Sequence, residues 1–198
     1  MTQAQTAELA AIAARLVVEE GMEYALAKRK AARSLASRTE LPSSEAVEAE
    51  VRSYLALYCA DTQPGELHAL RRFALRWMLR LAEFRPHLGG AVWRGTATRL
   101  SDVHLDLYCD DAKAMEITLI NRGITYDSTS LPAGHRGEPT TLLSLADDCT
   151  ELGERVTLHL AVRDLDDLRG ALKPDSQGRS WRGDVTALRR LLGEDAPP

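Results

Sequence analysis

Cysteine is scarce in this sequence and follows no metal-binding or disulfide pattern. The chain of 198 residues holds three cysteines, Cys59, Cys109 and Cys149, which are far apart and form no Cys-x-x-Cys pair. Their odd number and their spacing argue against a disulfide framework and against a structural zinc cluster. We therefore predict three buried free thiols.

Long apolar runs, lysine and asparagine are also rare. No apolar run approaches the roughly 18 residues that cross a bilayer, and the first residues lack the charged and apolar regions of a signal peptide. We expect a cytoplasmic protein with no membrane partner. Arginine outnumbers lysine by 21 to 4 and Asn121 is the only asparagine, a bias typical of a high-GC bacterial genome. The net charge of −4 at pH 7 argues against a broad nucleic-acid footprint.

Several catalytic signatures are missing as well. The chain contains no G-x-G-x-x-G, G-x-x-x-x-G-K-[ST], H-E-x-x-H or G-x-S-x-G motif. These absences disfavour dinucleotide-binding enzymes and P-loop NTPases.

The pattern that is present changes character at Pro86. Before it, apolar residues recur at three- and four-residue steps and predict helices over about 5–19, 22–37, 44–59 and 66–84, with Ser43 or Ser44 as an N-cap. After it, we predict short strands over 90–95, 103–111, 124–128, 140–148 and 155–162, a helix over 112–123 and a last short helix near the end. The predicted class is α+β, with an N-terminal helical region at 1–62 and an α+β domain at 63–198.

The strand predicted over 155–162 has the clearest alternation. One face carries Val156, Leu158, Leu160 and Val162, and the other carries Thr157, His159 and Ala161. We predict that the first face is core and that the second is available to a ligand.

A glycine pair precedes a strand with acidic and imidazole side chains. Gly89 and Gly90 would let the backbone come close to a triphosphate. Alternation along the later strand would point Asp102, His104 and Asp106 to one side. Oxygen ligands on one face are suited to hold Mg²⁺ near phosphates.

This segment resembles the signature of the nucleotidyltransferase superfamily, which has the polymerase-β-like fold. In that signature Gly-Gly or Gly-Ser is followed, after an intervening segment, by Asp-x-Asp or Asp-x-Glu, and RGTATRLSDVHLDLY is similar to its RGS-A-x-x-x-SDxDL form. The resemblance covers about 66–165. It implies a mixed sheet of about five strands with flanking helices, on which the N-terminal helical segment packs. It also implies that Gly89 and Gly90 face a triphosphate and that Ser101 lies beside the metal-binding acid Asp102.

The sequence departs from this signature at two of the three expected acids. His104 holds the second position, with Asp106 as a substitute further along, and a later strand offers Thr157 and His159 at the third. We predict Asp102 and Asp106 as catalytic residues and Asp102, His104, Asp106 and His159 as ligands of Mg²⁺ or Mn²⁺, or of Zn²⁺, which imidazole also suits. In a second interpretation, the same site holds a nucleotide or another phosphate ligand without transfer, with Arg94 or Arg99 assisting. In a third, these side chains form only turns and cross-strand hydrogen bonds.

The resulting hypothesis is a divergent nucleotidyltransferase-like protein that binds a nucleotide or small phosphate ligand, with nucleotidyl transfer weak, altered or lost. One alternative is an active metal-dependent nucleotidyltransferase with an unknown acceptor. Another is a partner-binding adaptor whose basic runs, Lys28 to Arg33 and Arg71 to Arg80, contact RNA or an acidic protein.

Overall fold

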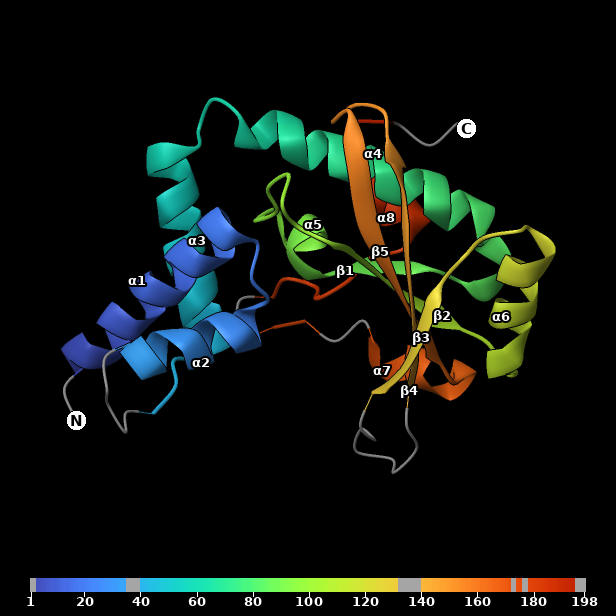
Figure 1. Ribbon diagram of the computed structural model, residues 1–198, viewed down its shortest axis with the longest axis horizontal. Coiled ribbons are helices and arrows are strands. Elements are labelled where there is room, and N and C mark those ends of the chain that lie inside the picture. Colours follow the sequence, from blue (N-terminus) through green and yellow to red (C-terminus); the bar gives the residue numbers. More distant parts are fainter. Residues whose placement is uncertain (1–2, 35–39, 132–139, 172–173, 176–177, 195–198) are drawn as a thin grey trace. The chain divides into compact units, whose positions relative to one another are not determined.

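The computed structural model describes residues 3–34, 40–131, 140–171, 174–175 and 178–194 (Figure 1). The chain divides into two compact units. The helical unit comprises Met1–Leu67 and Thr96–Ser101, and the sheet unit comprises His68–Gly95 and Asp102–Pro198.

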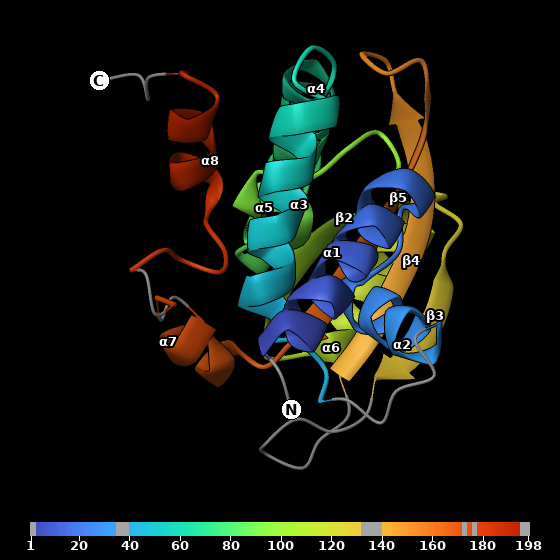
Figure 2. The same cartoon turned by 90° about the vertical axis from the view of Figure 1, so that its left-hand side faces the viewer.

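The helical unit is built on three helices, α1 (Gln3–Glu20), α2 (Tyr24–Ser34) and α3 (Ser44–Tyr58), shown in blue to cyan in Figure 2. Ser43 caps α3, because its side chain accepts a hydrogen bond from the backbone N–H of Ala46, which agrees with the predicted N-cap. The stripes of small and aliphatic residues pack into one core, whose buried members are Leu9, Ala10, Ala13, Ala14, Val17, Val18, Ala27, Ala31, Val47, Val51 and Leu55.

The segment Thr96–Ser101 joins this helical core although it is distant in sequence. The Gln63 side-chain amide donates to the carbonyl of Ala97 at 2.9 Å, and the backbone N–H of Arg99 donates to Glu66 at 2.9 Å. Gly21 has φ +65, and a Cβ atom there would lie 2.8 Å from the carbonyl oxygen of Leu100. Glycine is therefore favoured at this position for two reasons: the backbone is left-handed, and the carbonyl oxygen of Leu100 leaves no room for a Cβ atom.

The sheet unit holds a five-stranded mixed sheet in the order β1-β2-β5-β4-β3. The strands are β1 (His87–Gly89), β2 (Val103–Tyr108), β3 (Asp127–Leu131), β4 (Thr140–Cys149) and β5 (Glu154–Arg163). β2 and β5 are parallel, and the other neighbouring pairs are antiparallel. Figure 1 shows β4 and β5 as a long hairpin in orange. The predicted α+β class and the mixed sheet of five strands are confirmed.

Helices cover the apolar face of this sheet. The sheet unit contains α4 (Gln63–Arg80) from His68 onward, α5 (Gly90–Arg94), α6 (Ala112–Asn121), α7 (Leu168–Ala171) and α8 (Val185–Leu191), with short 3-10 turns at Ala82–Phe84 and Leu165–Asp167. The Trp77 indole of α4 donates to Asp147 at 2.9 Å, and Asp147 pairs in register with Val156 of β5. α4 therefore lies against the face that bears Val156.

The predicted alternation of β5 is confirmed. Val156, Leu158, Leu160 and Val162 are buried, and the residues between them are partly exposed. The opposite side of the sheet, called the polar face here, carries Thr157, His159, Ala161 and Arg163 of β5 with His104, Asp106 and Tyr108 of β2. Residues paired in register share a face, so the two strands present these side chains together.

Three expectations need correction. Gly90–Arg94 is a helix, not a strand, and it ends where Gly95 takes a left-handed conformation with φ +80. The fourth helix begins at Gln63 instead of 66, because a proline such as Pro64 fits in a first turn, where its missing N–H has no helical partner. All three cysteines are free, but Cys59 and Cys109 are only partly buried. None of the described helices has the length and hydropathy needed to cross a membrane.

Candidate functional site

One transverse row of residues crosses the sheet at the candidate site. Gly89 of β1 pairs with His104 of β2, and His104 pairs with His159 of β5. His159 pairs in turn with Ser144 of β4, which pairs with Asp127 of β3. The glycine pair and the acidic strand, which the sequence separates, are therefore neighbours in the sheet.

The Gly89–Gly90 corner lies directly against β2. Gly90 has φ +64, and a Cβ atom there would lie 3.2 Å from Cδ2 of His104. A Cβ atom on Gly89 would lie 3.9 Å from Oδ2 of Asp106. Because neither glycine has a side chain, only backbone atoms of the corner lie beside His104 and Asp106. A phosphate that approaches the backbone closely requires such an arrangement.

Asp102, His159 and Ser144 form a hydrogen-bonded chain. His159 Nε2 lies 3.2 Å from Asp102 Oδ2, and His159 Nδ1 lies 2.8 Å from Ser144 Oγ. The carboxylate accepts from Nε2, so in the neutral imidazole Nδ1 accepts from the hydroxyl. The hydrogen bond from His159 lowers the pKa of Asp102 against the opposing effect of burial, and a hydrogen bond from Thr157 adds to it. The His104 and His159 rings stack with centroids 4.8 Å apart.

Asp106 is paired with two arginines. Arg163 of β5 donates from Nε to Asp106 Oδ1, and Arg182 Nε lies 3.1 Å from Asp106 Oδ2. Arg182 also donates to the Tyr108 hydroxyl at 3.2 Å. Asp106 and Tyr108 are buried. Burial and the Asp106 charge raise the pKa of Tyr108. Sequence reasoning missed both arginines: Arg163 continues the alternation of His159 and Ala161, whereas nothing local signals Arg182.

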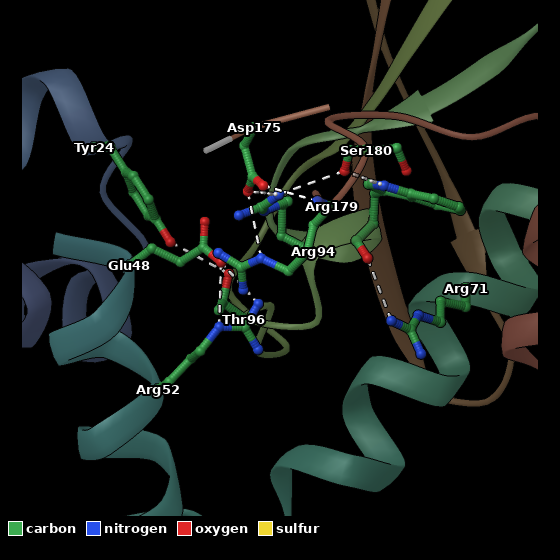
Figure 3. Close-up of polar contacts among 10 residues, drawn as sticks. Tyr24, Glu48, Arg52, Arg71, Arg94, Thr96, Asp175, Arg179 and Ser180 are labelled. Carbon is green, nitrogen blue, oxygen red and sulfur yellow. Dashed lines mark hydrogen bonds and ion pairs between the residues drawn. The ribbon is translucent and has the colours of Figure 1, made fainter. Parts of the chain in front are cut away.

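Two other residues predicted to bind the nucleotide, Arg94 and Ser101, interact with other residues of the protein. Arg94 forms an ion pair with Asp175 at 2.9 Å, and their side chains are 6% and 0% exposed (Figure 3). The Arg94 guanidinium also lies over the Trp181 ring, 4.5 Å from its centroid. Ser101 lies in the helical unit, where its hydroxyl accepts from the backbone N–H of Thr98 at 3.0 Å. Figure 3 also shows, within that unit, the Tyr24–Thr96 contact.

The two carboxylates of the predicted metal-ligand set already have partners in the protein. Asp102 accepts hydrogen bonds from His159 and Thr157, and both oxygens of Asp106 face guanidinium groups. Mg²⁺ and Mn²⁺ prefer several free oxygen ligands, and these carboxylates are already engaged. Among the residues that the structure describes, no three His, Cys, Asp or Glu side chains form a group that fits a metal ion. The metal-ligand set stays a prediction.

The comparisons with known proteins return a partial structural likeness. No protein-family model and no curated protein matches the chain. A structure of Cid1 in complex with the UTP analogue UMPNPP aligns with a TM-score of 0.33 at 16% identity, over 48% of this chain and 30% of that chain. A second structure of Cid1, described for its RNA terminal uridylyl transferase activity, aligns with a TM-score of 0.30 at 17% identity over the same shares. The chain therefore spans less than a third of these neighbours, and the proposed function rests on the site itself.

Proposed function

We propose that the chain binds a nucleotide or small phosphate ligand on the polar face of the sheet unit, beside Gly89, Gly90 and Asp106. The observation that carries this proposal is the pairing of Asp106 with Arg163 and Arg182 next to the glycine corner. Guanidinium groups recognise phosphate oxygens through fixed pairs of donors, and a glycine corner lets the phosphate approach the backbone. The ligand is then held by charge from arginine and not by a metal ion.

Metal-dependent nucleotidyl transfer is the weaker candidate on the same face. Two-metal transfer needs carboxylates that bridge the cations and stabilise both oxygens of the displacement. Asp106 is committed to two arginines and Asp102 to His159, so neither carboxylate is free for that work. The proposal is accordingly a nucleotide-binding, nucleotidyltransferase-like protein in which transfer is lost or altered.

The basic runs do not favour the adaptor hypothesis. Lys30 pairs with Glu20 at 2.6 Å, and Arg72 pairs with Glu151 at 3.4 Å. Arg76 and Arg80 both lie near Asp147, at 3.4 Å and 3.7 Å. Intramolecular carboxylates thus pair with one lysine of the first run and with three arginines of the second, which leaves less basic charge for RNA or an acidic partner.

Calorimetric titration with ATP, GTP, CTP and UTP tests the proposal directly. We expect saturable binding of at least one nucleotide in EDTA, with little change on adding Mg²⁺ or Mn²⁺. Gly89→Ala should weaken that binding by about 1 kcal/mol, about fivefold, because the added methyl group lies beside Arg182, where it hinders the approach of a phosphate to the backbone of the corner. Gly65→Ala is the matched control, since a Cβ atom at Gly65 has no neighbour within 4 Å.

The transferase alternative has its own readout. If nucleotide is turned over, diphosphate release should require Mg²⁺ or Mn²⁺ and should disappear in Asp102→Ala, whereas metal-free binding should not. Absence of saturable binding for all four nucleotides and for inorganic phosphate at millimolar concentration would contradict the proposed function.

A further inference from the structure

Two guanidinium groups contact Asp106 on the polar face of the sheet unit. A single carboxylate meets two guanidinium groups, from Arg163 at the end of β5 and from Arg182 in the segment before α8. Arginine keeps its charge at all relevant pH values, so the three groups together carry a net charge of +1 when Asp106 is ionised. Such a cluster attracts an anion if donors remain to bind it.

Donors do remain. Arg163 uses Nε for Asp106, and the negative charge of Asp167 also acts on its guanidinium group; the hydrogen bond that Arg182 donates to Tyr108 uses one terminal nitrogen. Nε of Arg182 is buried and lies 3.1 Å from Asp106, yet it makes no aligned hydrogen bond. This nitrogen is buried against Asp106, so the donors left for a ligand are terminal nitrogens of the two arginines. The two side chains are 31% and 25% exposed, so solvent and small ligands reach them.

The arginine pair adjoins the glycine corner. A Cβ atom on Gly89 would lie 4.0 Å from Cβ of Arg182 and 3.9 Å from Oδ2 of Asp106. The Tyr108 hydroxyl, which accepts a hydrogen bond from Arg182, adds a further polar group next to this arginine. The glycine corner, Asp106 and the Cβ atom of Arg182 are therefore neighbours.

We infer that Arg163 and Arg182 form a metal-independent clamp for a diphosphate group. The inference rests on the proposed function and names the residues and the ligand chemistry that it requires. Asp106 acts as the internal counter-ion: it holds both arginines in place and competes with the ligand for them. A diphosphate, with several acceptor oxygens and more than one negative charge, matches two planar donor groups better than a single carboxylate does.

Titration with inorganic diphosphate in EDTA tests the clamp. Arg163→Gln and Arg182→Gln should each weaken diphosphate binding by about tenfold, since each removes one charged donor group. Asp106→Asn should strengthen it by about threefold to tenfold, because the competing charge is removed while the side-chain shape is kept. Arg155→Gln, which removes an exposed arginine at the other end of β5, should leave binding unchanged.

The arginine variants are expected to weaken diphosphate binding and Asp106→Asn to strengthen it, so the two kinds of variant test the clamp in opposite directions. Circular dichroism identifies any arginine variant that fails to fold, and the gain expected in Asp106→Asn is a result that misfolding does not produce. Weaker binding in Asp106→Asn, or wild-type affinity in both folded arginine variants, would overturn the clamp.

Separate ligands distinguish this inference from the proposed function. Binding of ATP that both arginine variants retain would overturn the clamp and leave nucleotide binding standing. Binding of diphosphate that needs both arginines, with no binding of any nucleotide, would support the clamp and overturn the nucleotide proposal. Adenosine, which lacks phosphate, should not bind through these residues.

Discussion

At the scale of single residues, the backbone of Gly90 packs closely against the side chain of His104. Its φ is +64, and an added Cβ atom would lie 3.2 Å from the imidazole ring. We expect Gly90→Ala to lower the free energy of unfolding by about 1–2 kcal/mol for the left-handed backbone, with an additional cost for displacing the ring. Urea denaturation measures the total.

Gly153→Ala separates the two contributions to this cost. Gly153 has φ +68, and a Cβ atom there would have no neighbour within 4 Å, so this variant reports the backbone cost alone. The excess loss of stability in Gly90→Ala is the contribution of the His104 contact. Equal losses in the two variants would show that His104 moves away without cost.

Asp102 gives the site a pH dependence. Hydrogen bonds from His159 and Thr157 hold the pKa of Asp102 below its ordinary value. A carboxyl with a lowered pKa stabilises the folded state above its unfolded pKa of about 4, and that contribution is lost as the pH falls through the folded pKa. The side chain is 40% exposed, so the contribution should be below about 1 kcal/mol.

The measurement is the stability difference between the wild type and Asp102→Asn across the acid range. We expect the difference to be constant near neutral pH and to shrink below about pH 4. Asp110→Asn, which changes an exposed carboxyl after the end of β2, serves as the control. A difference that grows as the pH falls would contradict the assignment of the hydrogen bond to the ionised carboxylate.

At the scale of elements, the segment before α8 is fastened to β1 and α5. Leu88 and Gly183 form an antiparallel bridge, and the Trp93 indole donates to the carbonyl of Ser180 at 2.9 Å. A Cβ atom on Gly183 would lie only 2.1 Å from the Trp93 ring. The same segment carries Arg182, so its attachment positions one half of the proposed clamp.

Gly183→Ala therefore tests how an element positions the site. We expect a loss of about 1–3 kcal/mol in stability, because the rigid Trp93 ring cannot yield to the added methyl group. Trp93→Leu should relieve the clash, so the double variant should lose less than the sum of the single changes. Chemical denaturation of the four proteins gives the coupling energy, and strict additivity would refute the close contact.

The sequence predicted those parts of the site that depend on local pattern. The alternation of β5 predicted His159 on the polar face, and the acidic strand was predicted where β2 lies, which pairs with β1 through His104 and Gly89. The ion pairs of Asp106 were not predictable in this way, because Arg182 comes from an irregular segment whose return to the sheet leaves no periodic signal. Helix α5 was missed because five residues are too few for a helical period to emerge against the strand-forming residues Val92 and Trp93.

At the scale of the whole molecule, the candidate ligand groups are confined to one unit. Gly89, Asp106, Arg163 and Arg182 all belong to the sheet unit, whereas the helical unit has an aliphatic core of its own. A ligand that binds only the folded sheet unit stabilises that unit in proportion to its affinity. Whether the helical unit shares this stabilisation depends on whether the two units unfold together.

Hydrogen exchange with and without diphosphate distinguishes these cases. At a ligand concentration of 100 Kd the sheet unit should gain about 2.7 kcal/mol, so amides in β2 and β5 that exchange through global unfolding should slow by about 100-fold. If the units unfold separately, as their distinct cores lead us to expect, the amides of α1 and α3 keep their rates. Equal slowing in both units would show one cooperative body. Slowing in α1 and α3 alone would place the ligand away from Arg163 and Arg182.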